Sequence, residues 1–136
     1  MNVLIDTTIW SKYFRRKKIS EKDRIIVNEV DKIFDDLREI LIGPIRQELL
    51  SGISNEATFA ELKEKLAGFN DFIIETIDYE LAAEYHNICR RNGIQGSSTD
   101  YLICALAVKN DWEIFTEDTD FQYYKRYLPI KLYKMN

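Results

Sequence analysis

NVLIDTTIW, residues 2–10, is the stretch that decides the fold of this 136-residue chain. Residues 2–5 form a short apolar strand, and Thr7 or Thr8 can cap the helix that follows. Asp6 stands between the two elements, where a carboxyl group among apolar neighbours needs a polar partner or a cation. A strand that runs through an acid into a helix predicts a site at the end of that strand.

Strand and helix patterns alternate along the rest of the chain. Further strands are expected at residues 39–42, 72–77, 112–116 and 130–133, and helix caps at Ser20, Asn55, Asp78 and Ser97 or Ser98. No internal repeat or linker divides the sequence, so we expect a single domain over residues 1–136. This order predicts an α/β/α sandwich whose sheet has about five strands and is mostly parallel.

Composition and charge favour a soluble globular protein. Apolar residues make up 46% of the chain and charged residues 31%. No apolar run approaches the roughly 18 to 20 residues of a membrane span, and the N-terminus has no basic signal-peptide region. We therefore expect a cytoplasmic protein without a membrane partner. The net charge of −4 argues against nonspecific nucleic-acid binding through overall charge, although a local basic patch is compatible with it.

Four carboxylates are expected to meet at one edge of the sheet. Asp6 follows the first strand, and Asp118 follows the fourth by two residues. Asp100 lies in the first turn of the helix that leads to the fourth strand, and Glu48 lies one turn into the helix after the second. Because the carboxyl ends of parallel strands share one edge, we expect these acids to converge on one pocket.

Each acid also has a structural interpretation. Asp6 can cap its helix, Asp100 can complete a capping box with Ser97, and Glu48 can face solvent. Asp118 and Asp120 can form an Asx-turn and a helix cap. Cys89 and Cys104 are interpreted as small buried hydrophobes, because their spacing with the lone histidine does not fit zinc and a disulfide does not suit a reducing compartment.

A cluster of oxygen ligands suits Mg²⁺ or Mn²⁺ and the attack of a metal-activated water on a phosphodiester. Because the acids themselves repel phosphate, positively charged residues beside them are needed to bind the flanking RNA backbone. The basic patch of Lys12, Arg15, Arg16, Lys17 and Lys18 can serve as this RNA-binding surface. The alternative is a solvated helix end, where cations suit the helix dipole.

Four segments together resemble the PIN-domain proteins, specifically the VapC-type toxins. They are VLIDTTIW (3–10), GPIRQELLSGI (43–53), SSTDYLICALAVKND (97–111) and IFTEDTDF (114–121). The resemblance covers nearly the whole chain, in order. It implies that Asp6, Glu48, Asp100 and Asp118 are the catalytic acids, of which Asp6, Asp100 and Asp118 bind Mg²⁺ or Mn²⁺. It also implies auxiliary roles for Asp120, Thr8 and Thr116, and leaves open which of Glu117, Asp118 and Asp120 faces the metal.

The same resemblance implies an endoribonuclease that cleaves structured RNA, such as tRNA or ribosomal RNA, and so inhibits translation. It implies a homodimer and a cognate VapB-type antitoxin that blocks the site. Trp10, Tyr13 and Phe14 are candidates for antitoxin contact, with core burial as the alternative.

Two other functions are compatible with parts of the sequence. A phosphotransfer domain of the haloacid dehalogenase type also places an Asp after its first strand, but Thr8 stands where its second Asp is needed. A receiver domain needs a Lys after its fifth strand, and no Lys clearly matches it. A catalytically silent PIN-like module that only binds a partner is a further alternative, and the presence of all four acids argues against it.

Overall fold

A single parallel sheet forms the centre of the molecule. The computed structural model describes residues 1–14 and 20–135. Within this part of the chain, β1 (Val3–Ile5), β2 (Glu39–Ile42), β3 (Asp71–Phe72), β4 (Glu113–Phe115) and β5 (Lys131–Leu132) pair in the order β3-β2-β1-β4-β5. All four pairings are parallel. The prediction of about five mostly parallel strands is confirmed.

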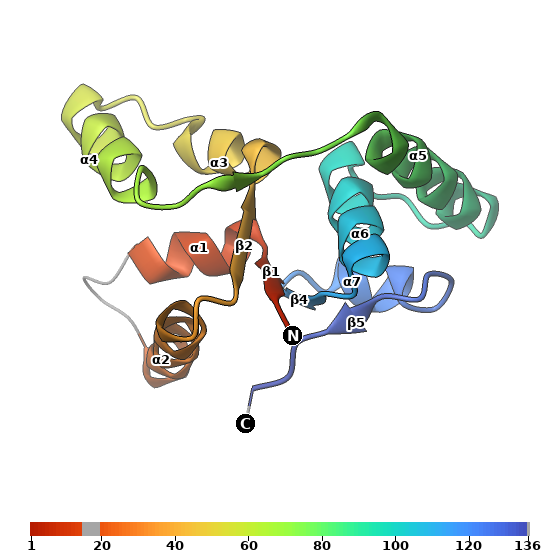
Figure 1. Cartoon of the computed structure of the whole chain (residues 1–136), viewed down its shortest axis with the longest axis horizontal. Coiled ribbons are helices and arrows are strands. Elements are labelled where there is room, and N and C mark those ends of the chain that lie inside the picture. The colour runs from red at the N-terminus through yellow and green to blue at the C-terminus, as the bar shows by residue number, and fades with distance from the viewer. Residues whose placement is uncertain (15–19, 136) are drawn as a thin grey trace.

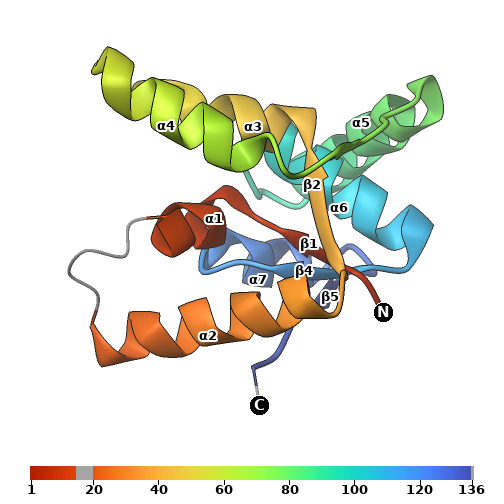
Figure 2. The same ribbon diagram turned by 60° about the vertical axis from the view of Figure 1, so that its left-hand side comes forward.

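Helices cover both faces of this sheet. They are α1 (Thr7–Phe14), α2 (Glu21–Asp35), α3 (Gly43–Leu50), α4 (Glu56–Leu66), α5 (Thr76–Arg91), α6 (Ser98–Asn110) and α7 (Asp120–Tyr124). Figure 1 shows α1 to α4 grouped on one side of the central strands and α5 to α7 on the other. In the turned view, α2 lies below α1, and α3 and α4 lie above it (Figure 2). The predicted α/β/α sandwich is therefore confirmed.

Local capping signals start α2, α4 and α6 where the sequence predicts. Ser20 accepts a hydrogen bond from the Asp23 amide, and Asn55 accepts one from the Thr58 amide. Ser97 caps α6 in the same way. Each cap satisfies an amide that has no partner inside its helix.

The predicted strand over residues 72–77 is wrong beyond Phe72. Glu75 is the N-cap of α5, and Asp78 accepts a hydrogen bond from the Glu75 amide at 2.8 Å, which completes a capping box. Helix α5 therefore begins at Thr76, and Asp78 lies inside its first turn instead of capping it. Strand β3 pairs only with β2 among the described strands, and Ile73 beyond it is 80% exposed, so β-branched composition alone does not extend the strand.

The core lies between the sheet and both helical layers. Trp10 is fully buried, and its indole N–H donates to the Ile5 carbonyl at 2.9 Å, so the core interpretation of this residue is confirmed. Cys89 and Cys104 are free and buried, as expected. Among the helices that the structure describes, none has both the length and the apolar character needed to cross a bilayer.

Candidate active site

The predicted acids meet where the strand order reverses. Strand β1 is the central strand, and the chain places β2 on one side of it and β4 on the other. In parallel sheets, the crevice at such a reversal is the usual ligand site. Here it is a cavity of about 460 Å³ that Asp6, Glu48, Asp100 and Asp118 all line. The tertiary structure therefore brings together the four carboxylates that the sequence singles out.

Asp6 is held in the wall of this cavity by two hydroxyl groups. Its side chain is only 6% exposed, and its Oδ2 accepts hydrogen bonds from Thr8 Oγ1 at 3.0 Å and from Thr116 Oγ1 at 2.7 Å. The same hydroxyls accept the backbone N–H groups of Glu117 and Asp118. This network joins the end of β1 to the loop after β4 and orients Asp6.

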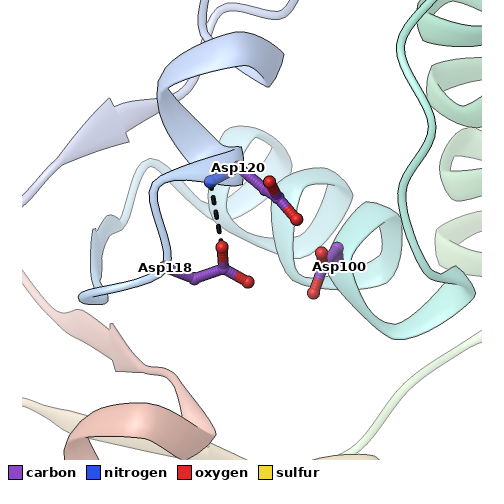
Figure 3. Close-up of side chains that lie close together, drawn as sticks. All are labelled: Asp100, Asp118 and Asp120. Carbon is purple, nitrogen blue, oxygen red and sulfur yellow. Dashed lines mark hydrogen bonds between the residues drawn. The ribbon is translucent and has the colours of Figure 1, made fainter.

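Asp100, Asp118 and Asp120 form a compact group of carboxylates within the described chain. One oxygen from each lies within 4.8 Å of the others. Figure 3 shows the three side chains pointing toward one another, from the first turn of α6, from the loop after β4 and from the start of α7. Asp118 Oδ1 also accepts the Asp120 amide at 2.9 Å, so the alternative Asx-turn is present and coexists with the cluster.

Burial and neighbouring charge raise the pKa of Asp100. Burial contributes most, hydrogen bonds from Tyr124 and Ser97 oppose it, and repulsion by Asp118 and Asp6 adds to the rise. The Tyr124 hydroxyl lies 2.6 Å from Asp100 Oδ2. A carboxyl group whose pKa is raised in this way is more easily neutralised by a proton or by a cation.

Glu48 is the one exposed residue among the four predicted acids. Its side chain is exposed, as the structural interpretation expects, but it still lines the cavity. Although the residue as a whole is exposed, partial desolvation of its carboxyl group raises its pKa, the Asp6 charge raises it further, and Asp100 adds a smaller rise. The nearby Thr7 hydroxyl opposes the rise, although its buried Oγ1 makes no hydrogen bond of normal geometry within the described residues.

Glu117 is turned toward Lys12, so Asp118 and Asp120 are the two acids after β4 that lie close to Asp100. Lys12 forms ion pairs with Glu117 and, at 2.8 Å, with Asp23. Lys12 also lines the cavity. Of the predicted RNA-binding residues, Arg15, Arg16 and Lys17 lie outside the described residues, as does Lys18.

Sequence reasoning missed Tyr124 and the closeness of Asp120 to Asp100. The contact between Tyr124 and Asp100 spans 24 residues, and no local pattern predicts it. The only available signal is the spacing of Asp120 and Tyr124, which places them four residues apart on one helix.

The donor set of this site fits a hard divalent cation. All the candidate ligands are carboxylate oxygens, which Mg²⁺ and Mn²⁺ prefer. The free cysteines are buried in the core and are not among the residues that line the cavity. Clustered carboxylates repel one another, and a bound cation removes that repulsion.

Residues 3–127 match the sequence model of the PIN domain family. Ribonuclease VapC11 of Mycobacterium tuberculosis is 32% identical over 123 residues, which cover 88% of each chain. The fold is similar to that of VapBC2 from Rickettsia felis bound to a DNA fragment from its promoter, with a TM-score of 0.75, 14% identity and full coverage of both chains. It is also similar to a toxin–antitoxin complex from Klebsiella pneumoniae, with a TM-score of 0.59, 20% identity and coverage of 88% of this chain and 90% of that one.

Proposed function

This chain belongs to the PIN domain family, and on that basis we propose that it is a metal-dependent endoribonuclease of the VapC type. The observation that carries the proposal is the convergence of Asp6, Glu48, Asp100 and Asp118, from four separate parts of the chain, on one cavity. The ribonuclease relative and the fold shared with a toxin–antitoxin complex support a role as the toxin of such a pair.

Asp6, Asp100 and Asp118 are the proposed ligands of Mg²⁺ or Mn²⁺, bound directly or through water. The 4.8 Å grouping adds Asp120 to this set as an auxiliary acid. When bound, such a cation lowers the pKa of a water molecule and neutralises charge that develops on the phosphate. The hydroxyls of Thr8 and Thr116 keep Asp6 oriented toward the cavity through their bonds to its Oδ2.

Glu48 is the proposed group that either completes the ligand shell or accepts a proton from the attacking water. Its raised pKa brings it closer to the working pH of a general base than an ordinary Glu. Its exposure leaves it accessible to water and substrate. Both roles predict a loss of cleavage when Glu48 is replaced by Gln.

The substrate proposed here is structured RNA, such as tRNA or ribosomal RNA, whose cleavage inhibits translation. Lys12 lies at the cavity wall and, with Arg15, Arg16 and Lys17, is proposed to bind the flanking backbone phosphates. In the described structure Lys12 is engaged by Asp23 and Glu117, so RNA has to compete with these carboxylates for it.

The proposed partners are a VapB-type antitoxin and a second copy of this chain, in the cytoplasm. An antitoxin that blocks a site of this kind needs a cation that reaches the acids, because the cavity is lined by four carboxylates.

Cleavage of total cellular RNA by the purified protein tests the proposed activity. Reactions contain Mg²⁺, Mn²⁺ or EDTA, and compare the wild type with Asp6→Asn and with Asp35→Asn, an exposed acid at the end of α2. We expect metal-dependent cuts by the wild type and Asp35→Asn but none by Asp6→Asn. Asp6→Asn should still fold, because it removes charge from a crowded group of acids.

Absence of cleavage under every metal, by folded wild-type protein free of antitoxin, would refute the nuclease and favour a module that only binds a partner. Loss of the fold in Asp6→Asn would argue that Asp6 is a structural acid instead of part of a metal site.

A further inference from the structure

Helix α7 contributes two side chains to the surroundings of Asp100. Asp120 is its first residue and Tyr124 its last, and a separation of four residues places them on the same helix face. Asp120 joins Asp100 and Asp118 in the carboxylate cluster. The Tyr124 hydroxyl donates a hydrogen bond to Asp100 Oδ2 at 2.6 Å. One short helix therefore provides both a neighbouring acid and a hydrogen-bond donor for Asp100.

Tyr124 has little freedom to move away from Asp100. Its side chain is fully buried, and its ring packs against Phe121 and Tyr101, each with ring centroids 5.1 Å apart. Gly96, just before α6, lies directly against this hydroxyl. A Cβ at Gly96 would lie 2.4 Å from the Tyr124 hydroxyl oxygen and 2.9 Å from Tyr101 Cζ. Such contacts are too short for any side chain, so glycine is needed here for close approach.

We propose that Tyr124 is a positioning residue of the acidic site, and that Gly96 provides the space in which its hydroxyl orients the Asp100 carboxylate toward Asp118 and Asp120. This inference rests on the metal site of the proposed function. A carboxylate has several lone pairs, so the bond from Tyr124 leaves acceptor capacity for a cation. Hydrogen-bond partners that orient a ligand typically contribute a factor of about 10 to 100 in metal affinity.

Direct binding of Mn²⁺ to the folded protein, without RNA, tests this role. Titration calorimetry and the electron spin resonance signal of free Mn²⁺ both report affinity independently of cleavage. Tyr124→Phe removes only the hydroxyl, and we expect it to bind Mn²⁺ about 10 to 100 times more weakly than the wild type.

Tyr133→Phe is the matched control, because Tyr133 donates the same kind of hydrogen bond to Glu29 Oε1 at 2.6 Å. Neither Tyr133 nor Glu29 lines the acidic cavity. This variant should bind Mn²⁺ like the wild type. Equal weakening in both tyrosine variants would mean that a general loosening of the fold lowers affinity, and would overturn the proposal.

Gly96→Ala provides a second test that keeps the Tyr124 hydroxyl but displaces it. It should weaken Mn²⁺ binding, whereas Gly43→Ala should not, because a Cβ at Gly43 has Asp71 Oδ2 as its nearest contact at 3.9 Å. Thermal unfolding identifies a temperature at which every variant is folded, and all titrations are done there.

Wild-type affinity in Tyr124→Phe would refute the positioning role, and wild-type affinity in Gly96→Ala would refute the role of Gly96. A wild-type protein that binds no Mn²⁺ would refute the proposed metal site and this inference with it. A third outcome is that the wild type binds Mn²⁺ but cleaves no RNA, and that Tyr124→Phe weakens this binding. That outcome would support the inference and refute only the proposed nuclease.

Discussion

The ion pair between Lys109 and Asp78 gives a quantitative test of how α6 is held in place. Asp78 on α5 is 1% exposed, and Lys109 Nζ on α6 lies 2.7 Å from its Oδ1. This contact joins the two helices, and α6 carries Asp100 in its first turn. Lys109→Met leaves the Asp78 carboxylate buried without its cation.

Removing one partner of a fully buried pair typically costs about 3 to 5 kcal/mol. Here the Lys109 side chain is 36% exposed, and Asp78 keeps the hydrogen bond from the Glu75 amide, so the loss should be smaller. We expect Lys109→Met to lower the free energy of unfolding by about 2 to 3 kcal/mol at pH 7. For a domain of this size, that corresponds to a fall in Tm of roughly 6 to 12 °C.

The free energy of unfolding that Lys109→Met loses should depend on pH in a definite direction. Burial alone would raise the pKa of Asp78, but the hydrogen bonds from Lys109 and from the Glu75 amide, with the Lys109 charge, lower it below 3.8. The wild-type pair therefore contributes stability above pH 3.8 and loses it as the pH falls through the lowered pKa. In Lys109→Met, we expect the effect of burial to outweigh the remaining hydrogen bond, so that Asp78 binds a proton at a higher pH than it does in the wild type. The difference between the two proteins should therefore narrow from pH 7 toward pH 4.

Urea unfolding at pH 7 and at pH 4, at one ionic strength, measures both effects. Lys65→Met is the control, because the Lys65–Glu61 pair is exposed and its loss should cost less than about 1 kcal/mol. A Lys109→Met protein as stable as Lys65→Met at pH 7 would refute the reasoning. A loss of the same size at both pH values would show that packing, and not the unpaired charge, causes it.

Two further predictions concern the acidic site and the basic patch. A Mn²⁺ concentration of about 100 times the Kd at pH 7 should stabilise the protein by about 2.7 kcal/mol at pH 7. The same concentration should stabilise it by less at pH 5. Raised pKa values let Asp100 and Glu48 bind protons more readily as the pH falls, and these protons compete with the metal. The same two acids lower the stability of the metal-free protein as the pH rises through their raised pKa values. Thermal unfolding with and without Mn²⁺ checks both trends. Equal Mn²⁺ effects at pH 5 and pH 7 would contradict the first, and a metal-free protein that is no less stable at pH 7 than at pH 5 would contradict the second. Changing Arg15, Arg16 and Lys17 together to Glu should weaken RNA binding and reduce the slope of log affinity against log salt by about 2. Unchanged binding in a filter assay would identify the patch as a solvated helix end.

The sequence by itself determined the elements whose signals are local. Ser20, Asn55 and Ser97 cap their helices because a side-chain oxygen reaches an amide only three residues away. The position of Asp6 at the end of an apolar strand likewise predicted a buried acid with polar partners. The convergence of Asp6 and Asp118 also followed from sequence order, because parallel strands bring their carboxyl ends to one edge.

Only the tertiary structure decided the contacts that join distant parts of the chain. The bond from Thr116 to Asp6 spans 110 residues, and the close approach of Gly96 to Tyr124 depends on how α6 and α7 pack. The end of β3 at Phe72 was decided in the same way, by pairing with a neighbour and not by composition. Such contacts depend on packing between elements, and the periodicity and capping signals of one segment contain no information about which residue packs opposite.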